Sequence, residues 1–307
     1  MAKRELGPVP EFRYKPGEEL VVTDEMKTAF DKDGFVLVRG LFTVPEIDKL
    51  EKCLKLGHVT KHAFDLPDGE KMNSRMVIFN HPGVDYTGLI GRCRRIVDTT
   101  EKLLGGEVYH YHTKINMKQP GTGGSFQWHQ DYGYWYKNGI LFPDLLSVMV
   151  AIHKCDRGNG CLKVLRGSHK LGRIDHIRIG GQNGADLDTL AECKKILEQV
   201  YVELEPGDGI FFHCNVLHSS DQNHSDRKRW VIIPCYNRMD NDPYIDHHHA
   251  RATKLVKVED SDLLACDVFD DVTGKWFMDP SIDKTIVAEK VNKDVTSLVE
   301  NPPEYKI

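Results

Sequence analysis

From Val108 onward, the sequence changes from helix-type to strand-type patterns, and this change limits the folds that the chain can adopt. Short apolar runs alternate with glycine-rich turns such as Pro206-Gly207-Asp208-Gly209. Many short strands joined by such turns are typical of a double-sheet β-architecture. We therefore predict a mainly β fold with flanking helices, a double-stranded β-helix of the cupin-like, jelly-roll type. The expected strands are Val108–Met117, Ser125–Gln130, Leu145–His153, Cys161–Leu165, Tyr201–Leu204, Ile210–Phe212 and Trp230–Tyr236.

Helix-type patterns precede Val108, and one more helix-type pattern interrupts the strand-type region that follows. Thr43 and Glu46 form an S/T-x-x-E capping box, which marks the start of a helix. Gly34 follows an earlier helical pattern, where glycine commonly ends a helix. The expected helices cover residues 23–33, 43–57, 89–104 and 186–200, and the expected early strands are Phe35–Arg39 and Met76–Phe79.

The length of 307 residues suits one decorated barrel. We expect a single domain over residues 1–307, with a mostly helical wrapper (1–107), a jelly-roll core (108–237) and a peripheral C-terminal segment (238–307). The core would carry a helical insert near residues 171–200. A net charge of −5 argues against nucleic acid or an anionic membrane as the main partner.

The cellular location is expected to be the cytoplasm. The first ten residues lack an apolar signal region, and no stretch approaches the roughly 18 consecutive apolar residues of a membrane helix. The eight cysteines include no CxxC pair, which is typical of reduced thiols in a chain of this length. The sequence does not indicate the oligomeric state.

The motif His129-Gln130-Asp131, with His218 far along the chain, indicates a metal site. In a strand, residues i and i+2 share a face, so His129 and Asp131 should point the same way. Two imidazoles and one carboxylate can hold one face of an octahedral ion, as in non-haem Fe(II) oxygenases. Zinc also accepts these ligands, so both metals remain open at this point.

Arg229 follows His218 and begins an apolar run, which suggests a site for a carboxylate-bearing co-substrate. The planar guanidinium can grip a carboxylate through two parallel hydrogen bonds. Arg227 and Lys228 are alternative anchors, but the spacing and the strand that follows favour Arg229.

Four segments resemble the phytanoyl-CoA dioxygenase superfamily of Fe(II)/2-oxoglutarate-dependent oxygenases, and most of all its members that act on small free metabolites, such as ectoine hydroxylase and free-proline hydroxylases. The resemblance covers residues 34–237. The segments are GFVLVRGLF (34–42), INMKQPGTGGSFQWHQDYGYW (115–135), NGCLKVLRGSHKLGRIDH (159–176) and LEPGDGIFFHCNVLHSS with the residues up to Arg229 (204–229).

By motif position, the resemblance implies that His129, Asp131 and His218 are catalytic iron ligands and that Arg229 holds the distal carboxylate of 2-oxoglutarate. It also places Ser220, Asn116 and Phe126 around that co-substrate. Retention of Asp131 implies hydroxylation rather than halogenation.

Other residues are expected to meet the substrate. Trp135 matches a family position near the substrate. His112, Lys114 and Asn116 share one strand face, which could line the barrel interior or meet solvent, and we favour the interior. Residues 171–200 form a candidate lid. The candidate substrate residues are Trp135, Tyr134, Gln127, His112, Lys114 and Arg173.

The resemblance implies a dioxygenase that hydroxylates an unactivated C–H bond of a small polar metabolite, best a free amino acid of the proline or ectoine type. It would use Fe(II) and O2 and convert 2-oxoglutarate to succinate and CO2, and ascorbate should help in vitro. Two alternatives remain, a cupin-like metal- and ligand-binding protein without turnover, and the same chemistry on a lipid-like or acyl substrate. No segment resembles a coenzyme A site. The run His247-His248-His249 is expected to be a solvated polar turn rather than a surface metal site.

Overall fold

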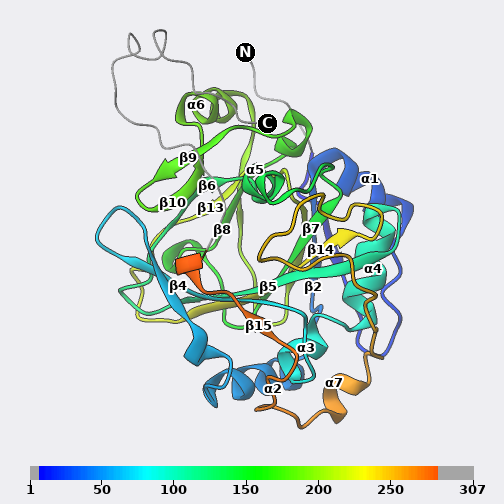
Figure 1. Cartoon of the computed structure of the whole chain (residues 1–307). Helices are drawn as coiled ribbons and strands as arrows, with labels where there is room; N and C mark the ends of the chain where they lie inside the picture. Colours follow the sequence, from blue (N-terminus) through cyan, green and yellow to red (C-terminus); the bar gives the residue numbers. More distant parts are fainter. Residues whose placement is uncertain (1–6, 283–307) are drawn as a thin grey trace.

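Two facing β-sheets form the core of the computed structural model, which describes residues 7–282 (Figure 1). The large sheet has the order β1-β2-β12-β7-β14-β5-β4-β15, with β3 beside β4, and the small sheet has the order β11-β8-β13-β6. The mainly β, jelly-roll fold class is therefore confirmed. The strands of the large sheet are β1 (Glu11–Arg13), β2 (Phe35–Arg39), β3 (Phe64–Pro67), β4 (Asn73–Asn80), β5 (Val108–Lys118), β7 (Leu145–Ala151), β12 (Gly209–His213), β14 (Arg229–Arg238) and β15 (Trp276–Phe277).

The small sheet and a separate hairpin complete the strands. The small sheet contains β6 (Phe126–His129), β8 (Leu162–Leu165), β11 (Gln199–Val202) and β13 (His218–Ser220). The hairpin pairs β9 (His176–Ile179) with β10 (Gln182–Ala185).

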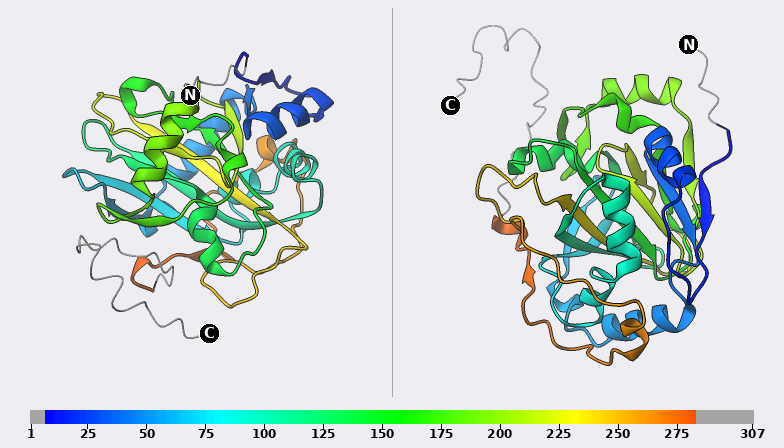
Figure 2. Two further views of the ribbon diagram at one scale, coloured as in Figure 1. Left: turned by 90° about the horizontal axis from the view of Figure 1, so that it is seen from above. Right: turned by 90° about the vertical axis from the view of Figure 1, so that its right-hand side faces the viewer.

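Helices lie mainly outside the two sheets. Figure 2 shows α6 at one end of the molecule and α2 with α7 at the opposite end. The α-helices are α1 (Asp24–Asp33), α2 (Val44–Lys55), α3 (Tyr86–Ile90), α4 (Arg94–Leu104), α5 (Asp131–Trp135), α6 (Leu187–Ile196) and α7 (Asp262–Ala265), and the 3-10 turns are Thr60–His62, Tyr136–Asn138, Arg157–Asn159, Ser168–Leu171 and Pro280–Ile282. Within residues 7–282, no helix is long and apolar enough to cross a membrane.

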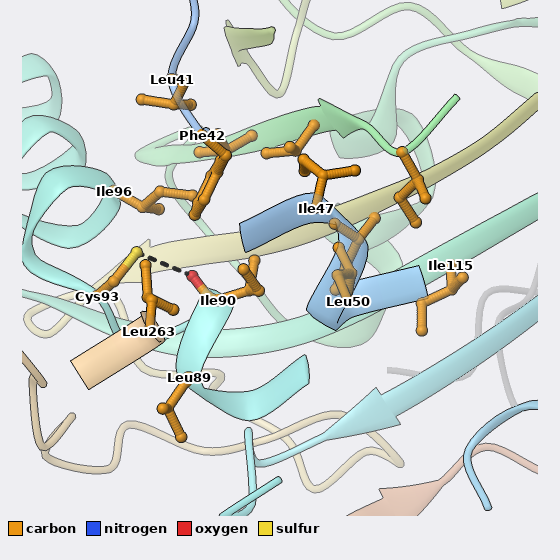
Figure 3. Packing of buried hydrophobic residues seen from close by; sticks show 14 of the residues in the cluster. Leu41, Phe42, Ile47, Leu50, Leu89, Ile90, Cys93, Ile96, Ile115 and Leu263 are labelled. Atoms are coloured by element: carbon orange, nitrogen blue, oxygen red, sulfur yellow. Dashed lines mark hydrogen bonds between the residues drawn. The ribbon is translucent and has the colours of Figure 1, made fainter. Parts of the chain in front are cut away.

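The large sheet buries both of its faces because its central strands carry apolar side chains at successive positions, which point to opposite faces. Val36 and Val38 of β2 belong to a cluster with α1 to α4 and α7, whereas Phe35 and Leu37 face the small sheet. Figure 3 shows part of this outer cluster, to which Leu50, Ile96 and Leu263 of the helices and Ile115 of β5 all belong. The helical wrapper therefore leaves the inner face of the sheet to hold a site.

Helix starts and strand cores agree with the local sequence signals. Thr23 accepts a hydrogen bond from the backbone N–H of Met26, and Gly34 ends α1 at a φ of 84°. Strand β2 has the predicted bounds. The backbone N–H of Thr43 donates to Glu46 Oε2 at 2.7 Å, as the capping box requires.

Two predicted helices are wrong in extent. The pattern over residues 89–104 forms two helices, because residues between them exchange backbone hydrogen bonds with Val258. The pattern over residues 186–200 ends as a helix at Ile196, because Val200 pairs with Val164 of β8. In both places tertiary pairing overrides the local helical preference.

The edge strands were not predicted. Strand β1 pairs in parallel with β2, and β15 pairs with the end of β4. The expected peripheral segment thus contributes to the large sheet, while its part after residue 282 lies outside the described residues. The division into one wrapper, one core and one peripheral segment stays a prediction.

We expect Glu46→Ala to lower the free energy of unfolding by about 3–5 kcal/mol, because it leaves the buried Arg95 guanidinium with only the partly exposed carboxylate of Asp260, at 3.3 Å. Arg95 Nη2 lies 2.8 Å from Glu46 Oε1, and both side chains are at most 4% exposed. Asp31→Ala is the control, since its ion pair with Lys27 is exposed and should contribute less than about 1 kcal/mol. Equal losses in urea unfolding of the two variants would contradict this prediction.

Candidate functional site

His129 and His218 meet because β6 and β13 are neighbouring antiparallel strands of the small sheet. The register places His218 directly opposite His129, and their ring centroids lie 4.1 Å apart. Side chains of such directly opposed residues point to the same face of a sheet. Two histidines that are distant in the sequence therefore reach the space between the two sheets together.

Backbone contacts orient both imidazoles. Nδ1 of His129 lies 2.7 Å from the carbonyl oxygen of Gln127, and Nδ1 of His218 lies 2.9 Å from that of Val216. If each Nδ1 carries the proton and donates it, each Nε2 keeps a lone pair for a metal ion. Burial, and for His129 also the neighbouring His218, lowers the pKa of both rings, which keeps them neutral near pH 7.

Asp131 reaches the same place from a helix rather than from a strand. Strand β6 ends at His129, and Asp131 is the first residue of α5, so the expected strand geometry is wrong although the convergence is observed. Oδ1 of Asp131 accepts hydrogen bonds from Lys114 Nζ at 2.6 Å and the Tyr134 hydroxyl at 2.8 Å. Oδ2 accepts one from Ser147 Oγ at 2.9 Å.

The charge on Asp131 is maintained despite its burial. Burial alone would raise its pKa, but the ammonium of Lys114 and the two imidazoles lower it well below the usual value. Lys114 responds in the opposite sense, because burial lowers its pKa and Asp131 raises it more. The site therefore presents one carboxylate and two neutral imidazoles.

These three side chains fit a metal ion. Each offers one ligand atom, and the three atoms lie within 4.8 Å of one another. His129 Nε2 and Asp131 Oδ1 are 3.9 Å apart. Two nitrogens and one carboxylate oxygen on one side leave the side toward the cavity open for other ligands, which is the donor set of a 2-His-1-carboxylate site.

Arg229 lies in the same cavity, at the start of β14. Its side chain is 1% exposed, and Nη2 contacts Met149 Sδ at 4.0 Å. In the described part of the chain, its Nε has no hydrogen-bond partner and the guanidinium has no carboxylate in ion-pair range. A buried cation is costly unless an anion pairs with it, so the arrangement fits an acidic ligand.

The three other candidate co-substrate residues also line this cavity, which has a volume of about 250 Å³. Asn116 lies on β5 across from Val231 of β14, and Ser220 is opposite Phe126 in the pairing of β13 with β6. The cavity thus connects Arg229 with the three side chains that fit a metal. It offers an amide and a hydroxyl between the two.

The candidate substrate residues divide into two groups. His112, Lys114, Tyr134 and Trp135 line the cavity, so the polar face of β5 is interior as expected. The other two side chains point elsewhere. Gln127 Nε2 donates to the carbonyl oxygen of Asp68 at 3.1 Å, and Arg173 contacts Asp175 at 2.6 Å and the ring of Tyr136.

One wall of the cavity was not predicted from the sequence. An apolar set from the β3–β4 hairpin and the C-terminal segment contains Phe64, Leu66, Met76, Ile78 and Met278, and the β9–β10 hairpin adds Arg178, Gln182 and Asn183. The alternation of Phe64 with Leu66 and of Met76 with Ile78 was the available signal. The histidine run 247–249 is partly buried, and His248 and His249 line the cavity, so the expectation of a solvated turn is wrong.

We expect Ser147→Ala to weaken metal binding by roughly tenfold while leaving turnover at saturating metal within a factor of a few. The change removes the hydrogen bond to Asp131 Oδ2 and little volume, and loss of such an outer contact typically costs ~10–100-fold in metal affinity. The concentration of Fe(II) that gives half-maximal turnover measures this effect. An unchanged value would show that Ser147 does not position Asp131.

Comparisons with known proteins agree with this geometry. The model of the family described as Phytanoyl-CoA dioxygenase (PhyH) matches residues 30–231. The chain is 27% identical over 263 residues to L-proline trans-4-hydroxylase of Streptomyces griseoviridis, covering 79% of this chain and 96% of the relative. It is 26% identical over 236 residues to ectoine dioxygenase of Sphingopyxis alaskensis, covering 72% of this chain and 77% of the relative.

Solved structures give the same result. The crystal structure of EctD from S. alaskensis with 2-oxoglutarate and 5-hydroxyectoine superposes with a TM-score of 0.62 at 25% identity. The match covers 79% of this chain and 85% of that one. The matched residues 30–231 include the whole small sheet, most strands of the large sheet and every residue of the candidate metal site.

Proposed function

Because the chain belongs to the phytanoyl-CoA dioxygenase family, we propose that its cavity binds Fe(II) through His129, Asp131 and His218 and hydroxylates a small polar metabolite. The chain is an Fe(II)/2-oxoglutarate-dependent dioxygenase, like the proline hydroxylase and ectoine dioxygenase that it resembles. A free amino acid or a similar zwitterion is the proposed substrate class.

The observation that carries this proposal is the buried guanidinium of Arg229 in the cavity that also holds the three potential ligands. A metal site alone would fit zinc or iron equally well. The guanidinium of Arg229 adds an anion site beside the metal site. Together the two sites fit a dicarboxylate that reaches the metal with one end and Arg229 with the other.

Bound Fe(II) and 2-oxoglutarate supply the oxidising chemistry, in which decarboxylation to succinate and CO2 allows O2 to hydroxylate an unactivated C–H bond. The protein residues position and shield these groups. Arg229 would hold the C5 carboxylate of 2-oxoglutarate, and Asn116 and Ser220, which line the same cavity, would offer it hydrogen bonds. Phe126 and Met149 cover the ligand and exclude water.

The remaining wall suits a substrate with one charged end and one apolar side. Nζ of Lys114 lies 5.0 Å from the ring centroid of Trp135, and Tyr134 and Trp135 belong to the same helix, α5, as Asp131. Phe64, Met76 and Ile78 add an apolar part to the wall of the same cavity, and Ile78 stands beside Lys114 because β4 pairs with β5. The cavity volume of about 250 Å³ is small for a ligand site, which favours a small metabolite over a long acyl chain.

The test is a screen of free amino acids and compatible solutes for stimulated succinate formation with Fe(II), ascorbate and 2-oxoglutarate. We expect at least one small zwitterion to raise succinate formation above the uncoupled rate and to yield a hydroxylated product. Stimulation only by acyl or lipid-like compounds would overturn the substrate class. If neither succinate formation nor 2-oxoglutarate binding occurs, the protein is a binding module rather than an enzyme.

A further inference from the structure

Three consecutive histidines lie at the rim of the cavity, apart from the three residues proposed to hold iron. His247, His248 and His249 occupy the segment between β14 and α7, and each offers a ring nitrogen within 4.8 Å of the others. The ring centroids of His247 and His248 are 3.9 Å apart, and those of His248 and His249 are 4.2 Å apart. Side chains of consecutive residues rarely converge in this way, because an extended backbone points neighbours to opposite sides.

The segment that carries the three histidines is fastened at both ends. Arg251 forms ion pairs with Asp242 at 2.5 Å and with Asp246 at 2.7 Å, which ties the two ends of the segment together. The backbone N–H of Tyr244 donates to the carbonyl oxygen of Gly139 at 3.1 Å. The histidines are therefore held by the fold and do not belong to an open polar loop.

Asn80 of β4 anchors the segment close to the histidines themselves. Its side-chain amide nitrogen donates to the carbonyl oxygen of His248, and its oxygen lies 3.4 Å from Nδ1 of His249. The contact with Asn80 occupies Nδ1 and leaves Nε2 of His249 for another partner.

His112 of β5 provides a second, independent observation. Its side chain is 1% exposed and lines the cavity, yet neither of its ring nitrogens has a hydrogen-bond partner in the described part of the chain. Its ring centroid lies 4.7 Å from that of His249. A buried imidazole without a partner is costly, so its nitrogens fit a ligand at this place.

We propose that His247, His248 and His249 bind a second divalent transition-metal ion of the zinc class at the rim of the cavity, with His112 beside them as a further nitrogen donor. Imidazole nitrogen suits zinc, copper and nickel, whereas magnesium and calcium prefer oxygen ligands. Three imidazoles leave one position of a tetrahedral ion open for water or His112. In this cluster, as in that formed by His129, Asp131 and His218, the three donor atoms lie within 4.8 Å of one another.

The charges around the rim permit such an ion. Burial and the neighbouring imidazoles lower the pKa of His249 well below its usual value, and the pKa of His112 is lowered by burial, His249 and Lys114, so these rings are neutral donors near pH 7. The ammonium of Lys114 is the nearby cation, and it is paired with Asp131. The carboxylate of Asp246 is engaged with Arg251. An ion here would form part of the cavity wall, because His248 and His249 line it.

The experiment counts Zn²⁺ equivalents by calorimetric titration of the full chain and four variants. We expect two equivalents for the wild type, one for His129→Ala/His218→Ala, one for His247→Ala/His248→Ala, and none for the quadruple variant. His224→Ala, which removes an exposed histidine elsewhere, should keep two. Because the two pairs of histidines are removed separately, failure of the rim site is distinguishable from failure of the proposed iron site.

A second measurement guards against misfolded variants. In the His129→Ala/His218→Ala protein, one equivalent of Cu²⁺ should give an electron paramagnetic resonance spectrum with hyperfine coupling to several imidazole nitrogens. The single change His247→Ala should weaken Zn²⁺ at this site at least about tenfold. A single Zn²⁺ equivalent in the wild type, or two equivalents retained by His247→Ala/His248→Ala, would overturn the proposal.

Discussion

Replacing His129 with alanine is expected to lower the rate of succinate formation by more than about 100-fold. Loss of a hydrogen bond to a metal ligand typically costs up to ~100-fold, and loss of the ligand itself should cost more. Only Asp131 and His218 would then remain as ligands, and the open side of the site would lose its defined geometry. The metal content of the purified variant should fall in parallel. Succinate release with saturating 2-oxoglutarate and iron analysis after desalting measure the two effects.

The matched control for His129→Ala is His224→Ala, because His224 is exposed and does not line the cavity. Circular dichroism should show the same secondary structure for both variants. A His129→Ala protein that folds, retains iron and turns over like the wild type would contradict the assignment of His129 as a ligand.

The sequence predicts the residue types of the site better than the local structure that brings them together. His129, Asp131 and His218 were identified from their chemistry and spacing. Their convergence depends on the register between β6 and β13, which includes an irregularity between His218 and Ser220. No local pattern encodes that register, since it is set by how whole strands pair.

The missed cavity wall has a related cause. Strand β3 is four residues long, and β15 has two residues, so neither gives a clear periodic signal. Phe64 and Leu66 of β3, and Met278 directly after β15, reach the cavity because β4 joins both strands to the large sheet. A contact that depends on three segments far apart in the sequence is not visible from any one of them.

Gln127 and Arg173 illustrate the opposite error. Each lies close in the sequence to a residue that lines the cavity, yet Gln127 turns to Asp68 and Arg173 to Asp175. Side chains at successive positions of a strand point to opposite faces, so nearness in the chain does not imply nearness to the site. Proximity to a motif in the sequence is therefore weaker support for a cavity-lining residue than a shared strand face. The shared face of β5 correctly placed His112 and Lys114 in the interior.

Arg229→Met should produce two effects of opposite sign. The affinity for 2-oxoglutarate should fall by about 2–5 kcal/mol, or roughly 30-fold to several thousandfold, because truncation removes one partner of a buried charge pair. The ligand-free protein should be as stable as the wild type or more stable by up to about 4 kcal/mol, because a buried cation without a carboxylate is replaced by an apolar side chain.

Thermal or urea unfolding with and without 2-oxoglutarate separates these two effects. At a concentration of 100 times its dissociation constant, the ligand should stabilise the wild type by about 2.7 kcal/mol and the Arg229→Met protein by almost nothing. Arg227→Met is the control, since Arg227 is half-exposed and pairs with Asp156 at 2.7 Å outside the cavity. If Arg227→Met lost the stabilisation by 2-oxoglutarate and Arg229→Met kept it, the anchor would be Arg227. Arg229 is the first residue of β14, where it pairs with Lys118 of β5, and Arg227 belongs to the loop before this strand. Such an outcome would therefore also require this loop to fold into the cavity.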